Sequence, residues 1–142
     1  MPGRGRGPDL LVDTSVAVAF TVADHDRHRA TVNAVGDRRL GLAGHAAFET
    51  LSVLTRLPPP TRRTPATVVR LLATSFPYTR FLGAGGSATL LTELGAFGVA
   101  GRAVYDALVG ACALEHALPL ATRDRRALET YRLLDLDIEL VD

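Results

Sequence analysis

Three long apolar stretches of the sequence each contain a single charged side chain. These are Asp13 in residues 10–23, Glu49 in residues 40–55 and Asp106 in residues 103–114. Carboxylates are almost never fully buried without a partner, because an isolated charge is strongly disfavoured in a low-dielectric interior. Each of these three side chains therefore needs an ion-pair or hydrogen-bonding partner, or a place at the edge of a polar cleft.

The position of a fourth carboxylate favours the cleft. Asp13 follows a predicted buried strand, 10–12, and Asp124 follows another, 118–121. Ligand sites of open parallel sheets form beyond the carboxyl ends of the strands, so we expect these two side chains to meet there. Asp106 lies near the start of its predicted helix, where the helix dipole favours an anion.

Four carboxylates that meet would either take up protons or bind a cation. Two like charges about 4 Å apart repel by roughly 4 kcal/mol at an effective dielectric of about 20. Oxygen ligands without a Cys or His pattern favour Mg²⁺ or Mn²⁺ over Zn²⁺, and such an ion can activate water next to a phosphodiester. The alternative is that Asp13 and Asp124 only cap helices, while Glu49 and Asp106 pair with arginines.

Short apolar segments alternate with helical ones along the chain. The predicted strands are 10–12, 40–43, 80–82, 118–121 and 137–141. The predicted helices are 15–22, 25–35, 46–57, 64–76, 87–94, 102–116 and 124–133. Residues 83–86 are predicted to form a turn, with Ser87 as the following helix N-cap. This alternation predicts an α/β fold with a mostly parallel sheet. We expect one domain, 9–142, after a flexible leader, 1–8.

Composition excludes several classes of protein. The one cysteine, Cys112, permits no internal disulfide and indicates a reducing compartment such as the cytoplasm. No apolar run reaches the roughly 18 residues of a membrane span. All 16 basic residues are arginine. The absence of lysine excludes a GxxxxGK[ST] phosphate loop, a receiver-type phosphoacceptor and a haloacid-dehalogenase-type phosphatase, which depend on lysine.

Four segments, in this order, resemble the acidic motifs of PIN-domain ribonucleases. They are Leu-Val-Asp-Thr-Ser-Val (11–16), Glu-Thr-Leu-Ser-Val-Leu-Thr-Arg-Leu (49–57), Tyr-Asp-Ala-Leu-Val-Gly-Ala-Cys-Ala (105–113) and Leu-Ala-Thr-Arg-Asp-Arg-Arg-Ala (120–127). The chain is similar in length to the VapC toxins of type II VapBC toxin–antitoxin pairs. The resemblance implies a single PIN-like domain, an α/β/α sandwich with a short, mostly parallel central sheet.

The resemblance also implies a reaction and its residues. Asp13, Glu49, Asp106 and Asp124 would hold Mg²⁺ or Mn²⁺, and Thr14 and Thr122 would orient a ligand, water or phosphate. Water activated by the metal would cut RNA and leave 5′-phosphate and 3′-hydroxyl ends, which would inhibit translation and growth. The implied partners are a second copy of the chain and a VapB-like antitoxin that blocks the site, often with an arginine.

Arginines near the last acidic motif are candidate RNA contacts. Arg123, Arg125 and Arg126 flank Asp124 and are predicted to contact phosphates. Further candidates are Arg62, Arg63 and Arg102. The alternative is that these arginines only form a solvated surface. Two other functions stay open: a housekeeping RNA-processing PIN nuclease, and a non-catalytic PIN-like module that binds RNA or protein.

Overall fold

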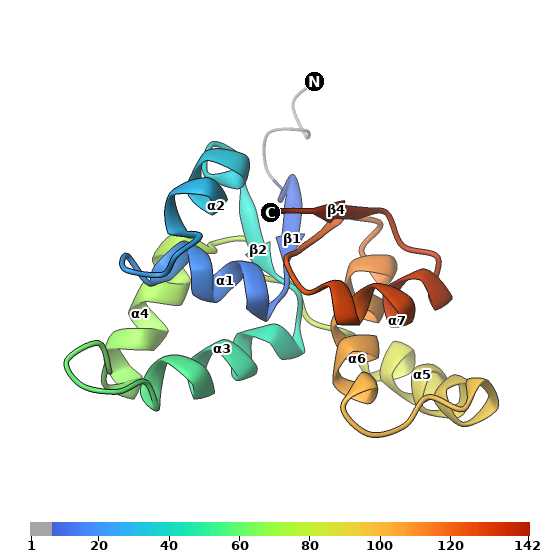
Figure 1. Cartoon of the computed structure of the whole chain (residues 1–142). Helices are drawn as coiled ribbons and strands as arrows, with labels where there is room; N and C mark the ends of the chain where they lie inside the picture. The colour runs from blue at the N-terminus through green and yellow to red at the C-terminus, as the bar shows by residue number, and fades with distance from the viewer. Residues whose placement is uncertain (1–6) are drawn as a thin grey trace.

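A short parallel sheet lies at the centre of the structure, a computed structural model that describes residues 7–142 (Figure 1). Its strands are β1 (Leu10–Val12), β2 (Leu40–Leu42), β3 (Leu120–Thr122) and β4 (Ile138–Leu140). Their order is β2-β1-β3-β4, and every neighbouring pair is parallel. β1 therefore lies between β2 and β3, and the carboxyl ends of β1 and β3 are adjacent.

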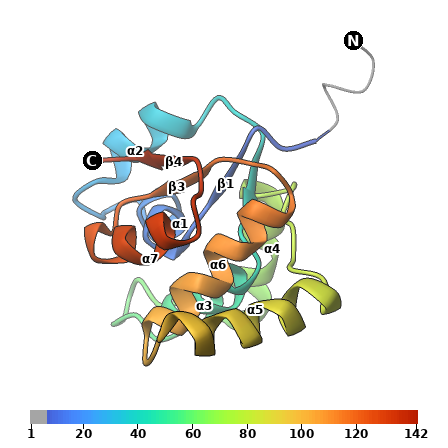
Figure 2. The ribbon, with the colours of Figure 1, turned by 90° about the vertical axis from the view of Figure 1, so that its right-hand side faces the viewer.

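Helices cover both faces of this sheet. They are α1 (Thr14–Thr21), α2 (His28–Val35), α3 (His45–Thr55), α4 (Pro65–Ser75), α5 (Ala84–Phe97), α6 (Ala103–Glu115) and α7 (Leu128–Leu133), with a 3₁₀ turn η1 (Arg125–Ala127) before α7. Figure 1 shows α1, α2 and α4 grouped apart from α5, α6 and α7, and Figure 2 shows α5 beside α6. The predicted α/β sandwich is confirmed, and the described sheet is parallel throughout.

Strand β1 supplies side chains to the apolar clusters on both faces of the sheet. Leu10 and Val12 pack into the apolar cluster built with α1, α2, α3 and α4. Leu11 packs into the opposite cluster, with side chains of α6 and α7. Successive side chains of a strand point to opposite faces, so this short apolar strand is buried on both sides. The strand fixes the position of Asp13, which follows it directly.

Two local predictions are wrong. Residues 83–86 do not form a turn before a helix start at Ser87, because α5 begins at Ala84 with Gly83 as its N-cap. A Cβ on Gly86 would meet the end of the Glu115 side chain, which can move aside, and a Cβ on Gly85 would meet no atom within 4 Å. The predicted strand 80–82 is reduced to a single parallel bridge between Ala43 and Arg80.

The start of the described chain is attached to the sheet. The Gly7 carbonyl accepts a hydrogen bond of 2.7 Å from Arg39 Nε, and Arg39 also forms an ion pair of 2.8 Å with Asp9. Most of the predicted leader, 1–8, lies outside the described residues. Within residues 7–142, no helix has the length and apolar character needed to cross a membrane.

Candidate active site

A polar cavity of about 640 Å³ opens at the carboxyl ends of β1 and β3. Its walls come from α1, α3, α6 and the segment after β3: Asp13, Thr14, Ser15, Glu49, Ser52, Val53, Arg56, Arg102, Tyr105, Asp106, Asp124 and Arg126. The four carboxylates singled out in the sequence thus lie around one cavity, although they come from four separate segments. Their chemical roles stay a prediction.

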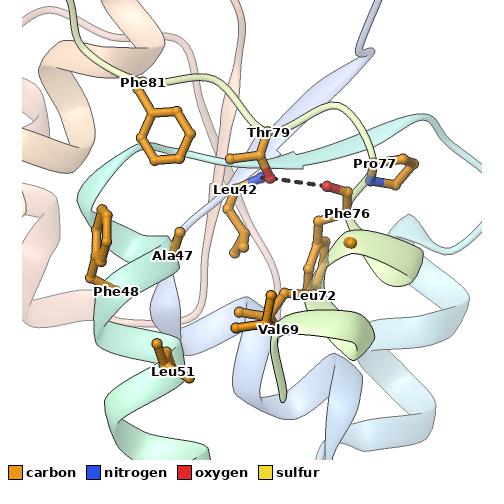
Figure 3. Close-up of a pocket in the computed structure, with 11 residues that line it drawn as sticks. Leu42, Ala47, Phe48, Leu51, Val69, Leu72, Phe76, Pro77, Thr79 and Phe81 are labelled. Atoms are coloured by element: carbon orange, nitrogen blue, oxygen red, sulfur yellow. Dashed lines mark hydrogen bonds between the residues drawn. The ribbon is translucent and has the colours of Figure 1, made fainter. Parts of the chain in front are cut away.

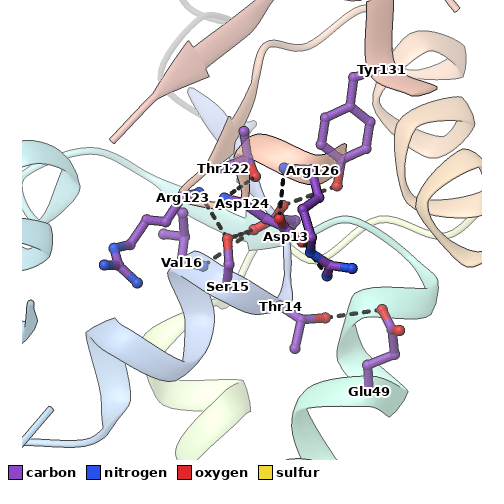
Figure 4. Close-up of polar contacts among 10 residues, drawn as sticks. All are labelled: Asp13, Thr14, Ser15, Val16, Glu49, Thr122, Arg123, Asp124, Arg126 and Tyr131. Carbon is purple, nitrogen blue, oxygen red and sulfur yellow. Dashed lines mark hydrogen bonds and ion pairs between the residues drawn. The ribbon is translucent and has the colours of Figure 1, made fainter. Parts of the chain in front are cut away.

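Asp13 is the most buried and most firmly held of the four. Its side chain is the N-cap of α1, where Oδ1 accepts hydrogen bonds from Ser15 Oγ at 2.6 Å and from the Val16 N–H at 3.2 Å. Oδ2 accepts a hydrogen bond of 2.9 Å from the Tyr131 hydroxyl (Figure 4). Burial raises the pKa of Asp13, and these hydrogen bonds oppose that rise.

Glu49 faces Asp13 across the cavity from α3. Thr14, at the start of α1, donates a hydrogen bond of 3.0 Å from Oγ1 to Glu49 Oε1 (Figure 4). Glu49 lies one turn into its helix, so the rigid backbone of α3 fixes where its side chain begins. Thr14 therefore holds a carboxylate of a neighbouring helix.

The pKa of Asp106 is affected by the charges of the other three carboxylates. Its pKa is raised to about 6, first by burial and then by the negative charges of Asp124, Glu49 and Asp13. The guanidinium of Arg126 acts in the opposite direction. The cavity is therefore a site of mutual repulsion between like charges, which a proton or a cation would relieve.

Asp124 is held by the turn that follows β3. Its backbone N–H donates to Thr122 Oγ1 at 3.0 Å. Its carboxylate accepts from the Arg126 N–H at 2.9 Å and pairs with the Arg126 guanidinium at 3.0 Å (Figure 4). Asp13 and Asp124 thus combine the two positions considered from the sequence: each caps a helical turn, and each also lines the cavity.

The candidate arginines differ in position. Arg126 and Arg102 line the cavity. Arg125 instead forms an ion pair of 3.0 Å with Asp142, at the end of the chain. The Arg123 backbone N–H donates to Ser15 Oγ at 2.8 Å, which ties the segment after β3 to the start of α1. The other two candidates, Arg62 and Arg63, do not line the cavity.

The donor set suits Mg²⁺ or Mn²⁺, because all four acids offer hard oxygen ligands. Among residues 7–142 as placed, no three His, Cys, Asp or Glu side chains are grouped closely enough to hold a metal ion. Glu49 bonds to Thr14, and Asp124 bonds to Arg126. Binding one ion by three carboxylates therefore requires a change of rotamer in this group. A bound cation would offset the repulsion that contributes to the raised pKa of Asp106, and so would favour such a change.

Sequence reasoning missed several residues of the site. The sequence singled out neither Ser15, beyond its place in the first motif, nor Tyr131, although both bond directly to Asp13. Tyr131 is 118 residues away from Asp13 in the sequence, so no local pattern links them. Tyr105 and Arg56 also line the cavity. For Tyr105, its place next to Asp106 in the third motif was an available signal.

A second hollow, of about 420 Å³, lies on the other side of α3 and is apolar (Figure 3). Its lining residues are Leu42, Ala47, Phe48, Leu51, Val69, Leu72, Ala73, Phe76, Pro77, Thr79 and Phe81. We call it the α3–α4 groove. None of these residues is titratable, so the groove offers a surface for packing and no acid–base chemistry. Phe48 is 61% exposed and Phe81 is 53% exposed.

A parallel sheet between two helical layers, with a polar cavity at its carboxyl edge, defines the class of α/β proteins that bind ligands at this edge. Within that class, the family model described as PIN domain matches residues 10–133. The chain therefore belongs to the PIN-domain family, as its four motifs indicated.

Curated relatives cover almost the whole chain. The chain is 44% identical over 131 residues to Ribonuclease VapC27 of Mycobacterium tuberculosis, covering 92% of this chain and 96% of the relative. It is 47% identical over 134 residues to Ribonuclease VapC40 of the same species, covering 93% and 98%. The resemblance to VapC proteins is thus confirmed.

Solved structures show the same fold at low sequence identity. The structure of VapBC2 from Rickettsia felis, bound to a DNA fragment from its promoter, matches with a TM-score of 0.66 and 14% identity, covering 94% of this chain and 98% of that chain. Mycobacterium tuberculosis VapC20, described as a toxin that cleaves the sarcin-ricin loop, matches with a TM-score of 0.65 and 18% identity, covering 84% and 93%. These likenesses support the fold.

Proposed function

We propose that this protein is a cytoplasmic endoribonuclease toxin that depends on Mg²⁺ or Mn²⁺ and inhibits translation and growth by cutting RNA. The single observation that carries the proposal is the convergence of four carboxylates on one cavity, where their repulsion helps to raise the pKa of Asp106 to about 6. The names of the curated relatives support the ribonuclease activity.

The four carboxylates would hold the metal, which when bound supplies activated water and withdraws charge from the scissile phosphate. Asp13 is the fixed ligand, because three donors hold its two oxygens. Thr14 orients Glu49 through its hydroxyl. Thr122 fixes the turn that carries Asp124, since its Oγ1 accepts the Asp124 N–H. Asp13 is therefore preorganised for the ion, whereas Glu49 and Asp124 would change rotamer as the ion binds.

We further propose a VapB-like antitoxin as the partner, with an apolar helix in the α3–α4 groove. Several structural neighbours are VapBC complexes, which supports a partner of that kind. The groove is apolar, and the ring centroids of the exposed residues Phe48 and Phe81 lie 6.1 Å apart at its edge. Contiguous exposed apolar patches often mark protein interfaces. The expected homodimer is part of this proposal, and light scattering of the purified chain tests it.

The test of the nuclease activity uses total cellular RNA and purified protein. Cleavage is followed with Mn²⁺ and with EDTA, beside an Asp106→Asn variant purified in the same way and a Glu129→Gln variant as control. Glu129 is an exposed carboxylate on α7 outside the cavity. We expect discrete cuts with 5′-phosphate ends, which EDTA and Asp106→Asn abolish and Glu129→Gln preserves.

Two results would contradict the proposal. Equal cutting by Asp106→Asn would indicate a contaminating nuclease. The absence of any metal-dependent cut would favour the non-catalytic PIN-like module. The identity of the RNA that is cut separates a toxin, which attacks RNA needed for translation, from a housekeeping nuclease, which trims precursor RNA.

A further inference from the structure

An aromatic pair, Tyr105 and His45, lies beside Asp106 and Glu49, and Tyr105 is the member that lines the cavity. Tyr105 immediately precedes Asp106 in α6 and lines the same cavity, yet its side chain is 48% exposed. Its ring stacks on His45, the first residue of α3, with a centroid distance of 5.1 Å and an interplanar angle of 13°. The pair therefore connects the two helices that carry Asp106 and Glu49.

This stacking fixes the orientation of an exposed ring. Offset, nearly parallel rings at this distance attract each other, so His45 supports one face of Tyr105. A side chain that is half exposed while one face is covered presents most of its free surface on the other face. A flat apolar surface held in place in this way is suited to stacking with another planar group.

Arginines also line the same cavity beside the carboxylates and suit the backbone of a nucleic acid. Arg56, Arg102 and Arg126 all line it, and Arg102 directly precedes the helix that carries Tyr105. Arginine contacts phosphates, while an aromatic ring stacks with any base that is free of its own partners. Bases inside a duplex are already stacked and paired, so only an unpaired base can reach such a ring.

We propose that the Tyr105–His45 pair is a stacking platform for one unpaired base beside the phosphate that is cut. This inference rests on the proposed nuclease function and adds the residue that selects for an unpaired base. His45 is a positioning residue, because it acts through the ring of Tyr105.

The first test measures binding without cleavage. A labelled 12-nucleotide single-stranded RNA and the same strand in a duplex are titrated with the protein in Ca²⁺, and fluorescence anisotropy reports binding. Tyr105→Leu removes the aromatic face, and we expect roughly ten-fold weaker binding of the single strand. Tyr105→Phe keeps the face and should bind like the parent protein.

A control variant removes an exposed aromatic ring elsewhere. Phe97 on α5 is 50% exposed and does not line the cavity. Phe97→Leu should leave the binding of single-stranded RNA unchanged. Thermal unfolding of each variant shows that Tyr105→Leu is folded before its binding is compared.

The second test is spectroscopic. The chain has no Trp and three Tyr residues, so its intrinsic emission comes from tyrosine. A base stacked on Tyr105 should quench part of this emission when single-stranded RNA binds. Tyr105→Phe should bind equally well but lose that part of the quenching, which a purely structural role of Tyr105 would not produce.

The outcomes separate this inference from the proposed function. Weaker binding by Tyr105→Leu together with quenching, but no cleavage in Mn²⁺, would support the platform and contradict the nuclease. The platform would be overturned if Tyr105→Leu bound single-stranded RNA as tightly as the parent protein and RNA caused no quenching. Metal-dependent cleavage in the same experiments would still support the nuclease. Equal affinity of the parent protein for duplex and single strand, or for neither, would also overturn the platform.

Discussion

At the scale of single residues, the site combines repulsion between acids with hydrogen bonds that hold them in place. Asp106 is affected mainly by burial and by the neighbouring charges, whereas Asp13 is held by hydrogen bonds from three donors. Folding therefore holds together groups that repel each other in the absence of a cation. The effect of this repulsion can therefore be measured as a change in the free energy of unfolding, without an assay of RNA cleavage.

Asp106→Asn should stabilise the metal-free protein at pH 7. The folded pKa of Asp106, about 6, lies above its usual value of 3.8, so folding favours the protonated form. The stability that this group contributes is full below about pH 4 and is lost as the pH rises through about 6. After allowance for solvent screening of a partly exposed group, we expect a gain of about 1 kcal/mol at pH 7.

Urea denaturation in EDTA at pH 4.5 and pH 7 measures this effect. The advantage of the Asn variant should be small at the lower pH, where Asp106 of the parent protein is mostly protonated. A variant that is less stable than the parent protein at pH 7 would instead identify Asp106 as a structural ion-pair partner.

Tyr131→Phe should weaken the site through Asp13. The variant removes the hydroxyl that donates to Asp13 Oδ2 at 2.9 Å and leaves a buried oxygen with one donor fewer. We expect a loss of about 1 to 2 kcal/mol in the free energy of unfolding and weaker Mn²⁺ binding by calorimetry. Tyr78→Phe, outside the cavity, is the matched control. Unchanged Mn²⁺ affinity in Tyr131→Phe would show that the hydroxyl does not position Asp13.

At the scale of elements, α3 separates two surfaces with different properties. It presents Glu49, Ser52 and Arg56 to the polar cavity, and Phe48 and Leu51 to the α3–α4 groove. Side chains three or four residues apart share a helix face, so one helix can serve both surfaces. A ligand in the groove would therefore touch the helix that carries Glu49.

The strand before α3 depends on a close backbone approach. A Cβ on Gly41 in β2 would lie 2.1 Å from the Tyr78 carbonyl oxygen and 2.8 Å from the Thr79 nitrogen, both backbone atoms. Gly41→Ala should therefore lower the free energy of unfolding by about 3 kcal/mol or more, because the backbone must move.

Gly95→Ala is the matched control for this substitution. Gly95 lies in α5, and a Cβ there would meet no atom within 4 Å. Alanine is the better helix former, so Gly95→Ala should stabilise the protein by up to about 1 kcal/mol. Thermal unfolding of both variants measures the contrast, and similar effects of the two would contradict the close packing at Gly41.

At the scale of the whole molecule, the sheet order brings distant segments to one edge. β1 pairs with β3 through Val12 and Ala121, so Asp13 and Asp124 lie at the ends of neighbouring strands. α3 and α6 then bring Glu49 and Asp106 to the same cavity. A cation that binds all of these segments should link them and stabilise the folded state as a unit.

At concentrations well above its dissociation constant, Mn²⁺ should raise the melting temperature of the parent protein roughly in proportion to the logarithm of the Mn²⁺ concentration. At about 100 times that constant, the stabilisation should be roughly 2.7 kcal/mol. Asp13→Ala should lose most of this effect, whereas Glu129→Gln, outside the cavity, should keep it. Equal stabilisation of Asp13→Ala and the parent protein would place the ion elsewhere.

Much of this protein could be predicted from its sequence. The short apolar strands and the helices between them predicted the α/β sandwich, because burial on two faces leaves a continuous apolar run. Isolated carboxylates such as Asp13 and Asp106 stood out, because a charge in an apolar stretch needs an explanation. Arg56 was not selected, although it lies seven residues after Glu49 in the predicted helix 46–57 and therefore on the same helix face.

Only the tertiary structure decided which groups meet across the fold. The hydroxyl of Tyr131 reaches Asp13 because α7 packs against the sheet, and the ring of Tyr105 meets His45 because α6 lies beside α3. It also decided that Arg126 turns towards the cavity while Arg125 pairs with Asp142. Periodicity and motif spacing describe neighbours along one element. Contacts between elements depend on how those elements pack, and no local sequence pattern specifies that packing.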